Sequence, residues 1–167
     1  MILSFVLLGM TVGLRTMTAM AVLCWFAWLQ LLPQHGWAFW VGSLVSVIVF
    51  TLAAVGEYVV DTLPSTPSRT SAFPLIARIV FGGLVGALAA HAVIEPAAGG
   101  AIFGLVGALM GAFGGVRVRR YWAKTVGADL PVALLESAFA LALAVGTCWQ
   151  LHALLVSILS TLPSATQ

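Results

Sequence analysis

Residues 100–120 read GAIFGLVGALMGAFGGVRVRR, and this stretch decides the fold. It holds no charged residue before Arg117, and glycine recurs at every third or fourth position. An apolar run of this length that ends on basic residues is typical of a helix that crosses the hydrocarbon core of a membrane and stops at the headgroups. The sequence therefore predicts a membrane helix over residues 100–117.

The composition of the whole chain agrees with a lipid environment. Of its 167 residues, 62% are hydrophobic and 7% are charged, whereas soluble domains carry about 25% charged residues. So few charges cannot cover a water-facing surface. The net charge of +2 comes from cations at predicted membrane edges, so a nucleic-acid partner is not expected. We expect one domain, residues 1–167, with the lipid bilayer as its partner.

The other apolar runs predict further membrane segments. Four more spanning helices are expected at 15–32, 37–60, 74–94 and 130–147, and shorter apolar segments at 2–13 and 149–162. Polar or proline-containing connections separate them at 33–36, 63–73 and 95–98. The predicted fold class is all-α: a polytopic transmembrane bundle of about five spanning helices with shorter segments at both ends.

The two ends of the chain allow several interpretations. Arg15 divides the apolar run 1–32, and Gly13 gives the backbone a place to bend; a single long tilted helix with Arg15 buried is the alternative. Residues 2–12 resemble the apolar part of a signal peptide, but no basic segment precedes them, so we expect them to be retained. Whether residues 1–14 and 149–162 are re-entrant, interfacial or spanning stays open.

The basic residues predict an orientation. Arg69 and Arg78 flank one loop, whereas the connections at 33–36 and 95–99 hold no lysine or arginine. Short loops rich in Lys and Arg stay cytoplasmic, and tryptophans gather at the membrane interfaces. We expect a multi-pass protein of the bacterial cytoplasmic (inner) membrane with its basic loops inside. The residues expected to contact lipid headgroups there are Arg117, Arg119, Arg120 and Lys124.

Small residues predict how two of the helices meet. Apolar side chains gain little from leaving lipid, so membrane helices associate by close contact across small residues. The glycine spacing over 100–117 keeps the glycines on one face, and the run 82–90 offers a matching small-residue surface. The expected packing residues are Gly83, Gly86, Gly104, Gly107 and Gly111.

A few ionisable residues fall inside or beside the apolar segments. They are Arg15, Glu57, Asp61, Arg78 and Glu136. Because an isolated charge is costly in lipid, we expect Arg15 to pair with Glu136 or Glu57. In one interpretation these groups form interhelical ion pairs and interface anchors. In the other they line a polar vestibule, open to the cytoplasm, that binds an ion or a small solute.

The sequence holds no recognisable catalytic or metal-binding pattern. No nucleophile elbow, zinc-protease motif or phosphate-binding loop occurs. Cys24 and Cys148 lie in apolar stretches and are expected to be buried free thiols. We therefore expect no enzymatic activity, no catalytic residue, no cofactor and no metal site.

Several short motifs resemble a bacterial integral-membrane family known as domain of unknown function 4126. They are Gly13-Leu14-Arg15, Glu57-x-x-x-Asp61-x-x-Pro64 with Pro67-Ser68-Arg69-Thr70, Val116-Arg117-Val118-Arg119, and Leu134-Leu135-Glu136. The similarity covers about residues 9–144, but Thr62 stands where the family often has a basic residue. The resemblance implies a membrane fold and topology, and it implies no activity.

Two functions remain open at this point. The protein could be a small permease or channel-like protein, alone or as a homo-oligomer, as its interrupted apolar segments and buried opposite charges indicate. The alternative is a non-catalytic structural or assembly subunit of a larger membrane complex, which the glycine-lined surfaces favour.

Overall fold

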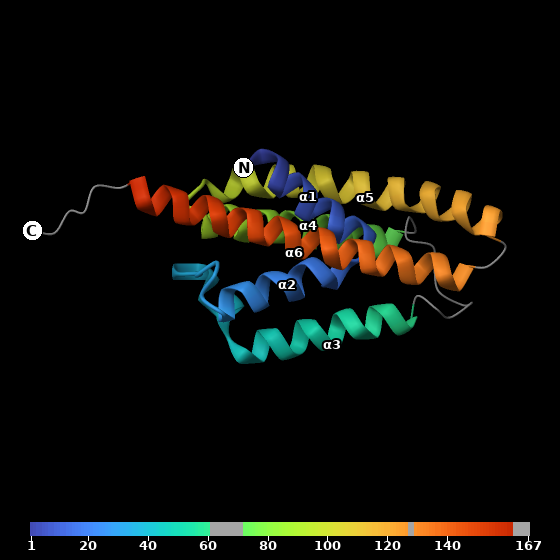
Figure 1. Cartoon of the computed structure of the whole chain (residues 1–167), viewed down its shortest axis with the longest axis horizontal. Coiled ribbons are helices and arrows are strands. Elements are labelled where there is room, and N and C mark those ends of the chain that lie inside the picture. Colours follow the sequence, from blue (N-terminus) through green and yellow to red (C-terminus); the bar gives the residue numbers. More distant parts are fainter. Residues whose placement is uncertain (61–71, 127–128, 162–167) are drawn as a thin grey trace, which may run out of the picture.

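The computed structural model describes residues 1–60, 72–126 and 129–161, with the side chains of residues 123–130 outside that description. Every regular element within these ranges is a helix, which confirms the all-α class (Figure 1). The elements are α1 (Ile2–Leu14), α2 (Thr16–Trp28), the 3₁₀ helix η1 (Gly36–Gly42), α3 (Leu44–Val60), α4 (Ala72–Ala92), α5 (Ala97–Val126) and α6 (Asp129–Thr161). Most of the predicted 63–73 loop lies outside the described residues.

Three of the described helices are long and apolar enough to cross a membrane. They are α4, α5 and α6, and the bent pair of η1 and α3 makes a fourth if it is counted as one span. These apolar helices make the chain compatible with an integral membrane protein. The sequence predicted about five spans, and the difference lies in the segment 15–32.

The predicted spanning helix at 15–32 is wrong, because α2 ends at Trp28. Gln30 takes a left-handed conformation with φ 59°, and the N–H groups of Leu31 and Leu32 turn back to the carbonyl of Phe26. This turn satisfies the last carbonyls of the helix and ends it. At 13 residues, α2 is about 20 Å long, whereas a bilayer core measures about 30 Å.

The predicted break at Arg15 is confirmed, and it makes a helical hairpin of α1 and α2. Arg15 is extended, with φ −141° and ψ 107°, between the ends of α1 and α2. Along α6, Ser4 bonds to Gln150, Arg15 reaches Ala133, and His152 bonds to the carbonyl of Leu31. The chain therefore runs along α6 through α1 and returns along it through α2. In Figure 1 α1 passes from the N-terminus toward the middle of the bundle and α2 comes back.

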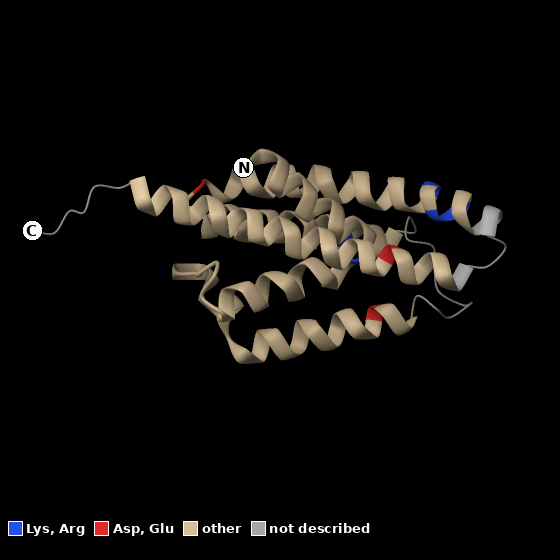
Figure 2. Ribbon diagram, viewed as in Figure 1, with Lys and Arg blue, Asp and Glu red and all other residues tan. Residues whose placement is uncertain are grey.

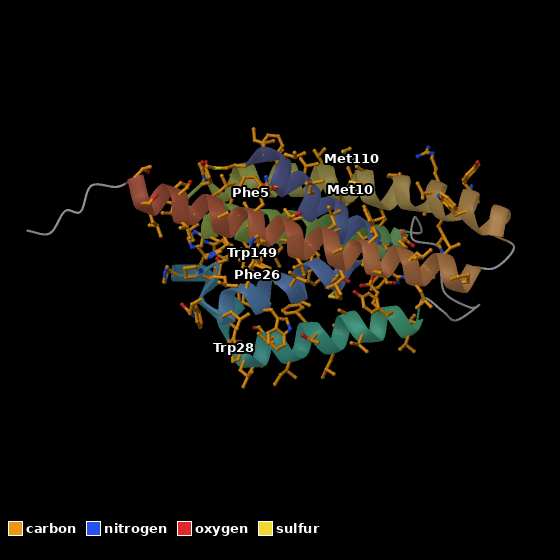
Figure 3. The ribbon with its side chains drawn as sticks, viewed as in Figure 1. Phe5, Met10, Phe26, Trp28, Met110 and Trp149 are labelled. Atoms are coloured by element: carbon orange, nitrogen blue, oxygen red, sulfur yellow. The ribbon has the colours of Figure 1, made fainter. Side chains whose placement is uncertain are left out.

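The hairpin occupies the centre of the molecule. Most of α1 and α2 is buried, between α5 and α4 on one side and α3 and α6 on the other. Phe26 of α2 meets Trp149 of α6 edge to face, with ring centroids 6.4 Å apart (Figure 3). The two short helices thus form the core against which the long helices pack.

The span predicted over 37–60 is broken in the structure: η1 and α3 meet at an angle of 63°, and they make one span only if the bent pair is counted together. Ser43 between them is extended, with φ −80° and ψ 145°. Its hydroxyl oxygen accepts the N–H of Ser46 at 3.1 Å, which is the usual role of a serine before the first turn of a helix. Because Ser43 caps a new helix, the chain changes direction there.

The last two helices are longer than the sequence indicated. The basic stretch predicted to follow residue 117 continues α5 to Val126. The separate segment expected at 149–162 is the second half of α6, which is continuous over 33 residues. Thr147 donates its hydroxyl to the carbonyl of Leu143 at 2.7 Å, so a polar residue there does not interrupt the helix. The connection between α4 and α5 is short, as predicted.

Glycines allow α5 to touch α1 and α4 at the backbone level. A Cβ atom added at Gly104 would collide with the carbonyl of Gly82, and one at Gly107 with the carbonyl of Val6. Gly86 and Gly111 are equally crowded, whereas a Cβ at Gly83 would meet only the Ala101 carbonyl, at 3.8 Å. The glycines of α5 therefore allow close contact with two helices, α4 and α1.

A Gly107→Leu variant should separate α1 from α5. Overpacking of this kind costs about 1–3 kcal/mol, and we expect a lower midpoint of thermal unfolding in detergent. The matched control is Gly114→Leu on the same helix, where nothing lies within 4 Å of an added Cβ. Equal unfolding midpoints for the two variants would contradict the packing described.

The hairpin also predicts which parts of the chain reach the same face of the membrane. Single cysteines at Ile2 and His35, in a background with Cys24 and Cys148 replaced by alanine, should react with a membrane-impermeant maleimide from the same face. A cysteine at Arg120 should react only from the other face. Reaction of the Ile2 and His35 positions from opposite faces would show that α1 and α2 cross the membrane together.

Candidate functional site

The break between α1 and α2 gathers the polar groups of the bundle interior. Arg15 has 1% of its surface exposed, and its Nη2 donates to the carbonyl oxygen of Ala133 at 3.2 Å. That carbonyl also accepts the hydroxyl of Ser137 at 2.8 Å. The guanidinium carbon lies 5.4 Å from the ring centroid of Tyr58, a distance at which a cation is attracted to an aromatic face. Arg15 thus joins the hairpin tip to α6 and α3.

Glu57 caps the N-terminal end of α2. Its two carboxylate oxygens accept the backbone N–H groups of Thr16 at 2.8 Å and Met17 at 2.9 Å. The first N–H groups of a helix have no partner within the helix, and they carry its positive partial charge. A carboxylate at this position satisfies both the hydrogen bonds and the charge.

A second polar contact beside Glu57 fixes α3 against α2. The hydroxyls of Tyr58 and Thr18 lie 2.8 Å apart, and Trp25 donates its indole N–H to Thr51 at 3.0 Å. Only Val47 and Ala54 of α3 are fully buried. Helix α3 is therefore held to the hairpin largely by a row of side-chain hydrogen bonds.

The remaining predicted site residues lie around this centre or beyond it. Glu136 on α6 approaches Arg119 of α5, with Oε2 and Nη1 4.0 Å apart. Arg78 is buried in α4, with 4% of its surface exposed. Asp61 lies outside the described residues.

The residues predicted to touch headgroups lie at one end of the molecule, which we call the basic end. Arg117 and Arg120 are exposed there and Arg119 is partly buried, whereas the side chain of Lys124 is not described. Figure 2 shows the lysines and arginines of the described residues confined to that half of the bundle. The opposite end holds the α4–α5 turn with Glu95. We call it the hairpin end because the α1–α2 hairpin opens there, with its tip at Arg15 pointing away.

Tyr58 belongs to the polar cluster at the break, although it was not among the site residues predicted from the sequence. A signal was present, because a tyrosine within an apolar helix needs a partner for its hydroxyl when it is buried. Its position directly after Glu57 could have placed it in the same polar cluster. The backbone N–H groups that Glu57 binds carry no sequence signal of their own.

The histidines lie at the hairpin end, away from the break. His152 Nδ1 lies 2.7 Å from the carbonyl oxygen of Leu31, and His91 Nε2 lies 3.0 Å from that of His35. Gln34 donates to the carbonyl of Leu88 at 3.1 Å. These bonds tie the α2–η1 connection to α6 and α4. Among the residues that the structure describes, no group of three or more His, Cys, Asp or Glu side chains could hold a metal ion.

Comparisons of this chain with protein-family models, with curated proteins and with solved structures found no match. The resemblance to domain of unknown function 4126 therefore stays a prediction.

A Glu57→Ala variant tests the cap on α2. Each buried N–H donor left without an acceptor costs about 1–3 kcal/mol, so the unfolding midpoint in detergent should fall and the amides of Thr16 and Met17 should exchange faster with deuterium. The control is Val55→Ala, because Val55 is half exposed on the same helix. Equal exchange rates of the two amides in Glu57→Ala and in the wild type would contradict the stabilising role of the Glu57 cap.

Proposed function

We propose that the protein is a small membrane permease or channel-like protein that binds an ion or small solute at the break between α1 and α2. The observation that supports this most is the interrupted helix pair itself, whose break lies inside the bundle at the buried Arg15 and is closed by Glu57 of α3. Irregular backbone at membrane depth is tolerated where protein or a water-filled cavity surrounds it. Transporters place solute sites at such broken helices.

The chemistry of the break favours an anionic solute. A buried guanidinium and the first N–H groups of α2 both attract negative charge. The group that occupies these donors in the structure is a carboxylate, that of Glu57. In the proposed mechanism Glu57 withdraws and a small anion with acceptor oxygens or a halide takes its place on Thr16 and Met17.

Two features suggest how such an anion would arrive. The arginines of the basic end raise the local concentration of anions by long-range attraction. Helix α3 carries Glu57 and has few buried apolar residues, so its displacement from α2 would expose the break. In this proposal the basic end faces the cytoplasm of a bacterium, and access is from that side.

A transport role is preferred here to an enzymatic one, because nothing in the cluster combines a nucleophile with a base. The alternative, a structural or assembly subunit of a membrane complex, is favoured by one observation: Glu57 and Arg15 already bond to protein groups across three helices. In that case the cluster would only hold the hairpin together.

Flux measurements separate these functions. Purified protein in liposomes should release chloride or acetate faster than empty liposomes do, and Arg15→Leu should lower the release to the empty-liposome rate. Glu57→Gln should keep release measurable and change its rate, since the competing negative charge is removed. Circular dichroism and gel filtration of each variant control for misfolding.

Two results would contradict the permease. One is the absence of chloride, acetate, sodium and potassium flux in vesicles that contain folded protein. The other is normal flux in a folded Arg15→Leu variant. Co-purification of a larger partner from native membranes, together with absent flux, would support the assembly subunit.

A further inference from the structure

A cavity opens at the hairpin end of the bundle, opposite to the break. It has a volume of about 600 Å³ and lies between the α2–η1 connection, the α4–α5 turn and the last turns of α6. Ligand sites for small molecules measure about 300–1,000 Å³. The cavity is therefore large enough for a small organic molecule or for part of a lipid.

The walls of this cavity are mainly apolar. Ile94 comes from the α4–α5 turn, and Leu155 and Leu159 come from α6. Leu155 is buried, whereas Ile94 and Leu159 are exposed. A ligand that fills the cavity would cover these apolar side chains, and burial of apolar surface favours binding.

The charge in this cavity is negative. Among the described residues that line it, Glu95 is the one Asp or Glu. The sequence contains no lysine or arginine in 16–68, 79–116 or 125–167, which include every lining residue. Figure 2 shows the same separation, with an acidic residue at the α4–α5 turn and the basic residues of the described chain in the other half. A cation could thus approach Glu95 without meeting a lysine or arginine side chain.

A histidine adds a second acceptor. The backbone carbonyl of His35 can only accept, so the Nε2 of His91 that lies 3.0 Å from it carries the hydrogen. In the neutral ring the other nitrogen, Nδ1, then has a lone pair and can accept a hydrogen bond. His91 and Glu95 both line the cavity. Together they offer a carboxylate and a ring nitrogen beside an apolar wall.

We propose that this cavity binds an ammonium group joined to an apolar chain, with Glu95 as the counter-ion and Leu155 and Leu159 as the apolar wall. Two sources share this chemistry: a soluble amine, and the ethanolamine headgroup of a phospholipid at the membrane edge. The site is independent of the proposed transport function, because the residues that line it lie in the α2–η1 connection, around the α4–α5 turn and in the last turns of α6, away from Arg15.

Calorimetric titration of the purified protein in a neutral maltoside detergent tests the soluble source. 2-Phenylethylammonium should bind, and 2-phenylethanol, which has a similar shape and no charge, should bind at least about tenfold more weakly, a factor of ten being about 1.4 kcal/mol. Glu95→Gln should lose the preference for the cation, and Glu95→Asp, which keeps the charge, should retain it. Gel filtration checks that both variants fold.

Native mass spectrometry tests the lipid source. Adducts of phosphatidylethanolamine that persist on the wild type and on Glu95→Asp, but not on Glu95→Gln, would assign the site to lipid. Amine binding without such adducts would assign it to a soluble ligand. The proposal is wrong if neither ligand binds, if the amine and the alcohol bind equally, or if Glu95→Gln binds the cation as tightly as the wild type.

Discussion

The pairing of one carboxylate with two backbone N–H groups supports the rest of this structure. Glu57 accepts the N–H groups of Thr16 and Met17, and this allows the chain to stop one helix and begin another inside an apolar bundle. An unsatisfied N–H in such surroundings costs several kcal/mol. Without an acceptor at this point, a continuous helix through Arg15 would be the more stable conformation.

Other features of the bundle follow from that break. Since α1 and α2 are both short and antiparallel, they fill the centre, and the long helices pack around them. Glycines of α5 bring its backbone against α1 and α4, which leaves room for the extra hairpin. Helix α3 stays at the periphery and contributes Glu57 and Tyr58. The helix with the fewest buried residues thus carries the groups that close the break.

Charge is divided along the long axis of the molecule. Arginines are concentrated at the basic end, whereas the hairpin end has Glu95 and histidines bonded to loop carbonyls. The proposed anion site and the proposed ammonium site each lie on the side where the neighbouring charges favour that ligand. A single chain with few charges can therefore offer two sites of opposite sign, because the apolar helices between them keep the charges apart.

The sequence by itself determined the all-α class, the position of α4 and the break at Arg15, because hydropathy and a rare charge within an apolar run depend on local composition. Only the tertiary structure decided that α2 ends before Gln30, that η1 and α3 bend at Ser43 and that α6 is continuous past Thr147. Hydropathy reports that a residue prefers lipid, but it does not show in which direction the chain runs at the end of a helix. Direction depends on which backbone groups find partners, and Thr16 and Met17 find theirs on a side chain about 40 residues away in the sequence.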